Sequence, residues 1–153
     1  MVFLQFRLGP DRYLIDAKRV VAVIPRVAVK ALPHTPPGLI GALRYRGSVV
    51  PVVDLCQLAL KRPASRQLST RIMLVHYATR PGPNRTLGLI AEQVNETLCR
   101  DAGDFVSSGV DHHSSAPYLG PVADDAAGML QQVRVDELLT PALQEVLFPD
   151  AVT

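Results

Sequence analysis

Hydrophobic and polar side chains alternate at the start of the chain. Between residues 4 and 8 every second position is apolar, which is typical of a half-buried strand. The turn-forming sequence GPDR at residues 9–12 separates this segment from a second apolar stretch that begins at Tyr13. The pattern therefore predicts an N-terminal β-hairpin.

Short apolar segments recur along the rest of the chain. Asp16 is suited to cap one helical turn, and the strand that follows over Val20–Ile24 should end at Pro25. Thr140 and Pro141 are the residue types expected at the N-cap and first position of a C-terminal helix. Further strands are predicted at residues 71–78, 87–94 and 95–99, and a hairpin is predicted over residues 118–135 with its turn near Asp124 to Gly128.

These patterns add up to roughly nine or ten short strands, about 8–12 residues apart, with little helix. Such spacing favours an all-β sandwich or barrel over a parallel α/β sheet. The length of 153 residues suits one domain, which we expect to cover residues 1–150.

The segment RYRGSVVPVVDL, Arg44 to Leu55, has the most distinctive composition. Gly47 permits a sharp backbone path, and the β-branched residues after it fit a strand that is packed on both faces. Pro51 cannot donate a ladder hydrogen bond, so it should lie at an edge or a bulge. Asp54 suits the N-cap of a short helix, and Arg46 can fork to a carboxylate and to backbone carbonyls, or contact a partner.

Composition narrows the function class. The chain is 48% hydrophobic and 20% charged, has a net charge of +2 and lacks Trp, so nucleic-acid binding is not indicated. No signal peptide or run of about 18 apolar residues is present, and we expect a cytoplasmic protein. Cys56 and Cys99 are isolated in the sequence and predict packed thiols rather than a disulfide.

Catalytic motifs are weak. The triplet DHH at residues 111–113 lacks the companion motifs of a metal-dependent phosphoesterase, and His34, His76 and Cys99 lack the short spacing of zinc ligands. The chain has no G-x-S-x-G motif, no phosphate-binding loop and no dinucleotide-binding motif. We therefore predict no enzymatic activity, no metal and no cofactor.

The segment PPGLIGALRYRGSVVPVVDL resembles the signature of the CheW-like adaptor family. Three further segments resemble the family in the same order: residues 3–16, residues 87–98 with Glu92 where aspartate is usual, and residues 118–139. Arg44 replaces a usual asparagine, and Ala22 replaces a glutamate that often pairs with the signature arginine. The pair Arg44–Tyr45 suggests a specialised branch, such as a surface-sensing (Wsp-type) system. The signature positions are Gly41, Arg46, Gly47, Pro51, Asp54 and Leu55.

The resemblance implies a fold and two partners. The fold would be two small five-stranded, SH3-like β-barrels lying side by side, with short helices that include a C-terminal one. The function would be a non-catalytic adaptor that couples the cytoplasmic tip of a methyl-accepting chemoreceptor to a CheA-type histidine kinase, at membrane-bound receptor clusters. The implied kinase-binding residues are Val20, Val21, Val23 and Arg46, the implied receptor-binding residues are Gly41, Ile72, Gly88 and Val94, and the structural positions are Gly47, Pro51 and Asp54.

A different class of function stays open at this point. Small barrels host many activities, so the chain could instead be a free-standing β-barrel domain that binds nucleic acid or a small ligand. A basic stripe with exposed aromatic side chains would favour nucleic acid.

Overall fold

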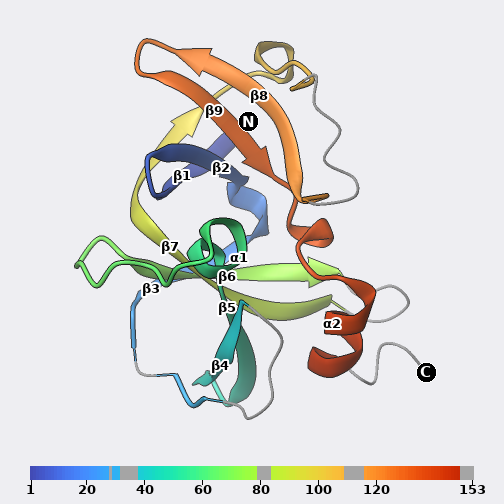
Figure 1. Ribbon diagram of the computed structural model, residues 1–153. Coiled ribbons are helices and arrows are strands. Elements are labelled where there is room, and N and C mark those ends of the chain that lie inside the picture. Colours follow the sequence, from blue (N-terminus) through green and yellow to red (C-terminus); the bar gives the residue numbers. More distant parts are fainter. Residues whose placement is uncertain (28, 32–37, 79–83, 109–115, 149–153) are drawn as a thin grey trace.

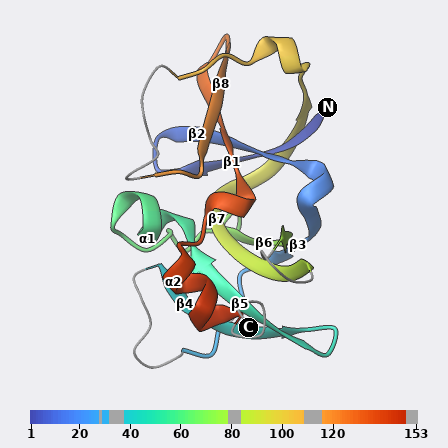
Figure 2. The same ribbon diagram turned by 90° about the vertical axis from the view of Figure 1, so that its right-hand side faces the viewer.

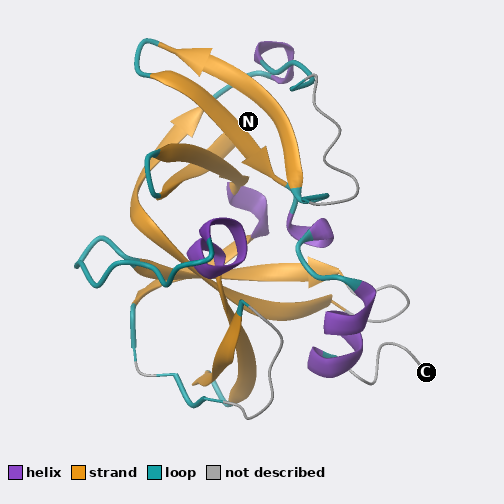
Figure 3. Ribbon diagram, viewed as in Figure 1, coloured by secondary structure: helices purple, strands orange, loops and turns teal. Residues whose placement is uncertain are grey.

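The computed structural model describes residues 1–27, 29–31, 38–78, 84–108 and 116–148. Strands dominate this part of the chain, and the helices are short (Figure 3). The strands are β1 (Val2–Leu8), β2 (Asp11–Asp16), β3 (Val20–Pro25), β4 (Leu39–Tyr45), β5 (Ser48–Asp54), β6 (Arg71–Ala78), β7 (Asn84–Cys99), β8 (Leu119–Asp125) and β9 (Gly128–Val133). The helices are α1 (Leu55–Leu60) and α2 (Pro141–Leu147), with 3-10 turns η1 (Ala17–Arg19), η2 (Ala102–Asp104) and η3 (Val135–Glu137).

Two five-stranded sheets share the long strand β7 (Figure 1). The first sheet runs β7-β1-β2-β9-β8, and the second runs β3-β6-β7-β5-β4. The first half of β7 pairs with β6 and β5, and its second half pairs with β1. The predicted strands at residues 87–94 and 95–99 are therefore one strand, in which Gln93 has a φ of 47°.

A single residue pair joins the two ends of each sheet. Lys30, which follows β3, exchanges two backbone hydrogen bonds of 2.9 and 3.0 Å with Ala42 on β4. Val106, which follows β7, exchanges two of 2.8 Å with Val122 on β8. Both sheets are therefore strongly curved, and they form the two halves of the molecule that Figure 2 shows one above the other.

A large hydrophobic core connects the two sheets and both helices. Phe6 and Ile15 enter it from the first sheet, and Ile72 and Leu89 enter it from the second. The C-terminal helix α2 is held against the second sheet by Phe148, whose ring stacks on Tyr77 at a centroid distance of 5.8 Å. A smaller cluster inside the first sheet contains Phe3, Leu14 and Leu130.

The predicted helix caps are confirmed. One carboxylate oxygen of Asp54 accepts from the amides of Cys56 (2.9 Å) and Gln57 (3.3 Å), and so it caps α1. Its other oxygen accepts from the Ala64 amide at 2.9 Å and holds the loop that follows the helix. The Thr140 hydroxyl accepts from the Leu143 amide at 3.2 Å at the start of α2.

Candidate functional site

The β4–β5 turn presents Arg46 to solvent. Arg46 and Gly47 have φ angles of 49° and 82°, and positive φ at both central residues is what a two-residue type I′ hairpin turn requires. Of the two roles left open for Arg46, the fork to a carboxylate is not formed among the described residues. In the described part of the chain its guanidinium lies over the Tyr45 ring, 5.3 Å from the centroid, so its charge stays available.

Strand β3 places the predicted kinase-facing valines on both of its faces. Val21 and Val23 are 41% and 39% exposed, and they form an apolar stripe on the outside of the second sheet. Val20 is half-buried and packs against the core, as does Ala22. Strand β3 is the end strand of its sheet. Among the described residues its strand pairing is to β6, so its other edge lies beside this stripe.

The predicted receptor-facing residues are all buried. Gly41 lies opposite Val52, and Val52 lies opposite Gly88, so these positions form one row across β4, β5 and β7. Ile72 on β6 contacts the same row, since a Cβ on Gly88 would lie 3.3 Å from the Ile72 side chain. Val94 lies further along β7, where its amide donates to Ser69 at 2.9 Å. These four residues are therefore part of the protein interior and are not exposed for direct contact with a receptor.

Pro51 lies at the point where β5 gains its second neighbour. It stands opposite Ala42, whose amide and carbonyl both bond Lys30 on the other side. The ladder from β5 to β7 begins one residue later, at Val52. Proline has no backbone N–H, and at this position no hydrogen bond between β5 and β7 is lost. This agrees with the place expected for a proline in a strand.

Glu92 is a buried carboxylate at the junction of the two sheets. It accepts from the Gly9 amide (2.9 Å), the Ser65 amide (2.8 Å) and the Arg62 guanidinium (3.2 and 3.3 Å). Burial raises its pKa, but the hydrogen bonds from Arg62, Ser65 and Gly9 outweigh this effect and lower the pKa to about 2. Glu92 thus ties the β1–β2 turn to the loop after α1.

A second polar cluster joins η1, β6 and η3. The Arg19 guanidinium forms a two-pronged ion pair with Asp136 and donates to the His76 carbonyl at 2.8 Å. Asp136 also accepts from the Ala78 amide at 3.2 Å. Sequence inspection missed this cluster, because Arg19 and Asp136 are 117 residues apart and neither lies in a motif.

Charge is divided unevenly along the chain, although the net charge is only +2. Residues 17–91 contain one acidic residue, Asp54, and twelve basic ones. Residues 92–153 contain eleven acidic residues and two arginines. Because β3 to β6 and the first half of β7 build the second sheet, that half of the molecule is basic. The twelve are Lys18, Arg19, Arg26, Lys30, Arg44, Arg46, Lys61, Arg62, Arg66, Arg71, Arg80 and Arg85.

A groove of about 620 Å³ lies on the basic half, between the segment after β3, strand β4 and the loop before β6. Leu68 is 98% exposed at this groove, and Val27 is 46% exposed. We call this feature the basic groove; its lining includes Arg26, Val27, Val29, Ile40, Arg66 and Leu68. It adjoins the predicted receptor row, because Ile40 precedes Gly41 and a Cβ on Gly41 would lie 2.8 Å from the Val29 side chain.

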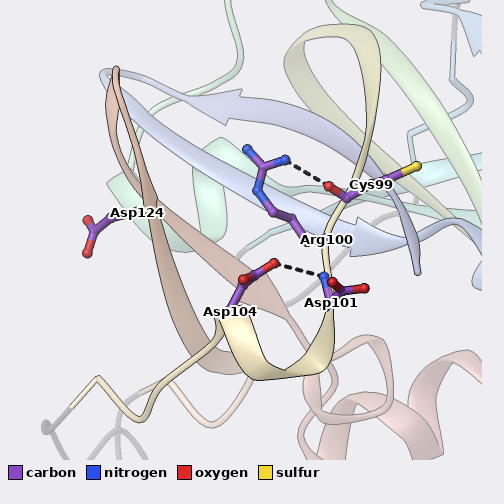
Figure 4. A pocket seen from close by; sticks show the side chains of 5 residues that line it. All are labelled: Cys99, Arg100, Asp101, Asp104 and Asp124. Atoms are coloured by element: carbon purple, nitrogen blue, oxygen red, sulfur yellow. Dashed lines mark hydrogen bonds between the residues drawn. The ribbon is translucent and has the colours of Figure 1, made fainter.

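The acidic half carries a depression of about 440 Å³ beside η2 (Figure 4). Asp104 accepts there from the Asp101 amide at 2.9 Å, and Arg100 donates to the Cys99 carbonyl at 2.8 Å. Asp124 extends from the β8–β9 hairpin on the other side. These contacts stabilise the 3-10 turn.

The described residues give no support to the weaker catalytic hypotheses. They contain no group of three or more His, Cys, Asp or Glu side chains that could hold a metal. His76 lies opposite Thr86 near the start of β7 and Cys99 ends that strand, so these two side chains are far apart. Burial raises the pKa of the Cys56 thiol to about 12, which makes it a poor nucleophile. His34 and the DHH triplet lie outside the described residues.

The CheW-like domain model matches residues 2–142. This chain belongs to the CheW-like family. Curated relatives include a probable chemotaxis protein CheW from Rhizobium etli, 25% identical over 93 residues, and the chemotaxis protein CheW of Klebsiella aerogenes, 29% identical over 96 residues. These matches cover 61% and 63% of this chain but 57% and 55% of the relatives, so the chain spans little more than half of their length.

The fold is that of CheW. The crystal structure of the scaffolding protein TtCheW from Thermoanaerobacter tengcongensis superposes with a TM-score of 0.79 at 21% sequence identity, over 91% of this chain and 87% of that one. In the described residues, no helix is long and apolar enough to cross a membrane. The sequence resemblance to this family is therefore confirmed, together with a mostly β fold that contains a few short helices.

Proposed function

We propose that this protein is a non-catalytic adaptor that couples a chemoreceptor to a CheA-type histidine kinase. The observation that carries the proposal is the match of the CheW-like domain over residues 2–142. The structure is compatible with this role, because the conspicuous features of its described residues are exposed apolar and charged surfaces.

In this proposal each five-stranded sheet is a small barrel, and the two barrels together form one domain over residues 1–150. The backbone pairs Lys30–Ala42 and Val106–Val122 support closure, since each joins the two end strands of its sheet. The core that runs between the sheets supports a single domain, because side chains of both halves pack into one cluster.

The proposed kinase-facing surface consists of Val21, Val23 and the β4–β5 turn with Arg46. Exposed valines, and an arginine that pairs with no carboxylate among the described residues, are features of an interface that is completed by another protein. Val20 supports this surface from the core side. The proposed receptor-facing surface overlies the row of Gly41, Ile72, Gly88 and Val94, which would shape it from beneath. We place the adaptor in the cytoplasm, at receptor clusters.

Titration calorimetry with the purified regulatory domain of the cognate kinase tests the adaptor function. We expect binding with a negative heat-capacity change, because apolar surface becomes buried. Val21→Glu and Arg46→Glu should each weaken binding. Met129→Glu should not, since Met129 is even more exposed than Val21 (59% against 41%) but lies on the other half. The absence of binding by the unmodified protein would rule the adaptor function out.

A pull-down with the cytoplasmic tip of a methyl-accepting receptor tests the second partner. Loss of receptor capture on Gly88→Leu, with kinase binding retained, would support the proposed receptor row. The Wsp-type branch stays a prediction; a surface-sensing operon around the gene would support it, and a flagellar chemotaxis operon would contradict it.

A further inference from the structure

The basic groove combines exposed apolar side chains with arginines. Leu68 is almost fully exposed and Val27 is nearly half-exposed, although both are large enough to favour burial. Arg26 is anchored, because its guanidinium donates to the Ala64 carbonyl at 3.2 Å. Arg66 is exposed at the same groove. The groove therefore offers an apolar floor beside fixed positive charge.

The described residues that line the groove include no Asp or Glu. The single acidic residue between positions 17 and 91 is Asp54, which is 1% exposed. Both of its oxygens are occupied by backbone amides, at Cys56 and at Ala64. The ion pairs at the junction of the two halves are Arg19–Asp136 and Arg62–Glu92. Neither of them involves an arginine of the basic groove. The field at the groove is therefore positive.

We propose that the basic groove binds an amphipathic segment of a partner protein that carries Asp or Glu beside its apolar face. Val27, Ile40 and Leu68 would accept the apolar side chains, and Arg26 and Arg66 would select the carboxylates. Charge complementarity of this kind accelerates association and rejects basic segments through like-charge repulsion. The inference rests on the proposed function, because we expect the cytoplasmic tip of the chemoreceptor to supply this segment.

Polypeptide fits the groove better than nucleic acid does. The large apolar residues exposed in the described part of the chain include no aromatic side chain, so the groove offers no stacking platform for bases. Its exposed apolar members are aliphatic, and they match the side chains that an amphipathic helix inserts into a groove.

The test uses the full-length ¹⁵N-labelled protein and three synthetic helical peptides that share one Leu-rich face. The peptides carry Glu, Lys or Gln beside that face, and a single-stranded oligonucleotide serves as the fourth ligand. We expect chemical-shift changes at Val27, Ile40 and Leu68 with the Glu peptide, and a Kd at least about tenfold lower than for the Lys peptide at low salt. The difference in Kd between the Glu and Lys peptides should become smaller at high salt, because salt screens the interactions between exposed charges.

Two variants and two controls locate the site. Arg66→Glu should reduce or reverse the preference for Glu over Lys peptides, and Leu68→Ser should weaken binding of the Glu peptide about fivefold. Both residues are exposed, so thermal unfolding should show that the variants are folded. Arg134→Glu and Met129→Ser, at exposed positions of the acidic half, should leave binding unchanged.

Several outcomes would overturn the proposal. They are equal binding of the Glu and Lys peptides, shifts confined to another surface, no shift at the groove with any peptide, or groove binding by the oligonucleotide alone. These outcomes are separate from the kinase titration and the receptor pull-down. Receptor capture that is insensitive to Arg66→Glu would leave the adaptor function standing and remove the groove as its acidic-segment site.

Discussion

Arg12 on β2 holds Asp125 at the end of β8 through both of its terminal nitrogens, at 3.0 and 2.6 Å. The same guanidinium donates to the Gly128 carbonyl at 3.0 Å, so it binds both sides of the β8–β9 turn. Arg12 is buried, and its hydrogen bond is the main cause that lowers the pKa of Asp125 to about 2. One side chain of the N-terminal hairpin therefore fixes a hairpin that lies 113 residues later.

Replacing Arg12 with Met should loosen the β8–β9 hairpin. The substitution leaves Asp125 without its main partner, and hydrogen bonds to charged groups contribute about 1.5–3 kcal/mol each to stability. We expect the free energy of unfolding in urea to fall by about that amount, with amide exchange accelerated at Ala123 and Leu130. Arg134→Met, at an exposed position, should change stability by less than about 0.5 kcal/mol. Equal effects of the two variants would show that the Arg12 ion pair contributes little.

Glu92 should make stability fall as the pH becomes acidic. Its pKa is about 2 in the folded protein against an ordinary value of 4.5, so the folded state favours the charged form. The resulting stabilisation is complete above the unfolded-state pKa and is lost as the pH falls from about 5 towards about 2. In Glu92→Gln this part of the pH dependence should disappear.

Urea denaturation of both proteins between pH 7 and pH 2.5 measures this effect. At pH 7 the natural protein should be the more stable of the two, and the difference should narrow towards pH 2.5. A constant difference across this range would mean that Glu92 does not have a lowered pKa in the folded state.

Gly47→Ala should destabilise the β4–β5 turn through backbone conformation alone. A Cβ at Gly47 would meet nothing within 4 Å, but the φ of 82° disfavours residues with a side chain by about 1–2 kcal/mol. Gly103→Ala is a matched control, since its Cβ also meets nothing within 4 Å and its φ lies outside the positive range. A drop in melting temperature in the first variant and not in the second is expected. Asn in place of Gly47 should cost less than Ala.

Gly41→Ala should open the second sheet at its join. A Cβ at Gly41 would lie 2.1 Å from the Lys30 carbonyl oxygen, which accepts the Ala42 amide. Overpacking against backbone costs about 1–3 kcal/mol or more. Amide exchange at Lys30 and Ala42 should accelerate more than exchange at Val106 and Val122, the corresponding pair of the first sheet. Uniform acceleration at both pairs would contradict a local effect.

Local patterns in the sequence were sufficient for most elements. Asp54, Thr140 and Pro141 predicted helix starts correctly, because capping depends on residues only a few positions apart. The predicted break between residues 94 and 95 was wrong. The chain continues as one strand, but its pairing with β1 shifts register between Glu92 and Glu96, in a segment where Gln93 has a positive φ.

Long-range relationships could not be predicted in the same way. The pairing of Arg19 with Asp136 and of Arg12 with Asp125 depends on the closure of the whole fold, and no spacing rule encodes it. The sequence left two roles open for Arg46, and the choice between a carboxylate and a partner likewise depends on residues that no local pattern names. By contrast, the division of charge at residue 91 was visible in the sequence, but the nearly neutral total concealed it.

Strand β7 makes the molecule a stiff connecting piece. Its 16 residues run through both sheets, and the backbone on either side of Gln93 is held by neighbouring strands. The Glu92 carboxylate braces the crossing point from both directions. A force applied to one half should therefore rotate the other half with it. We therefore expect the protein to act as a rigid body, which transmits a change in the position or orientation of one bound partner to the other without changing its own conformation.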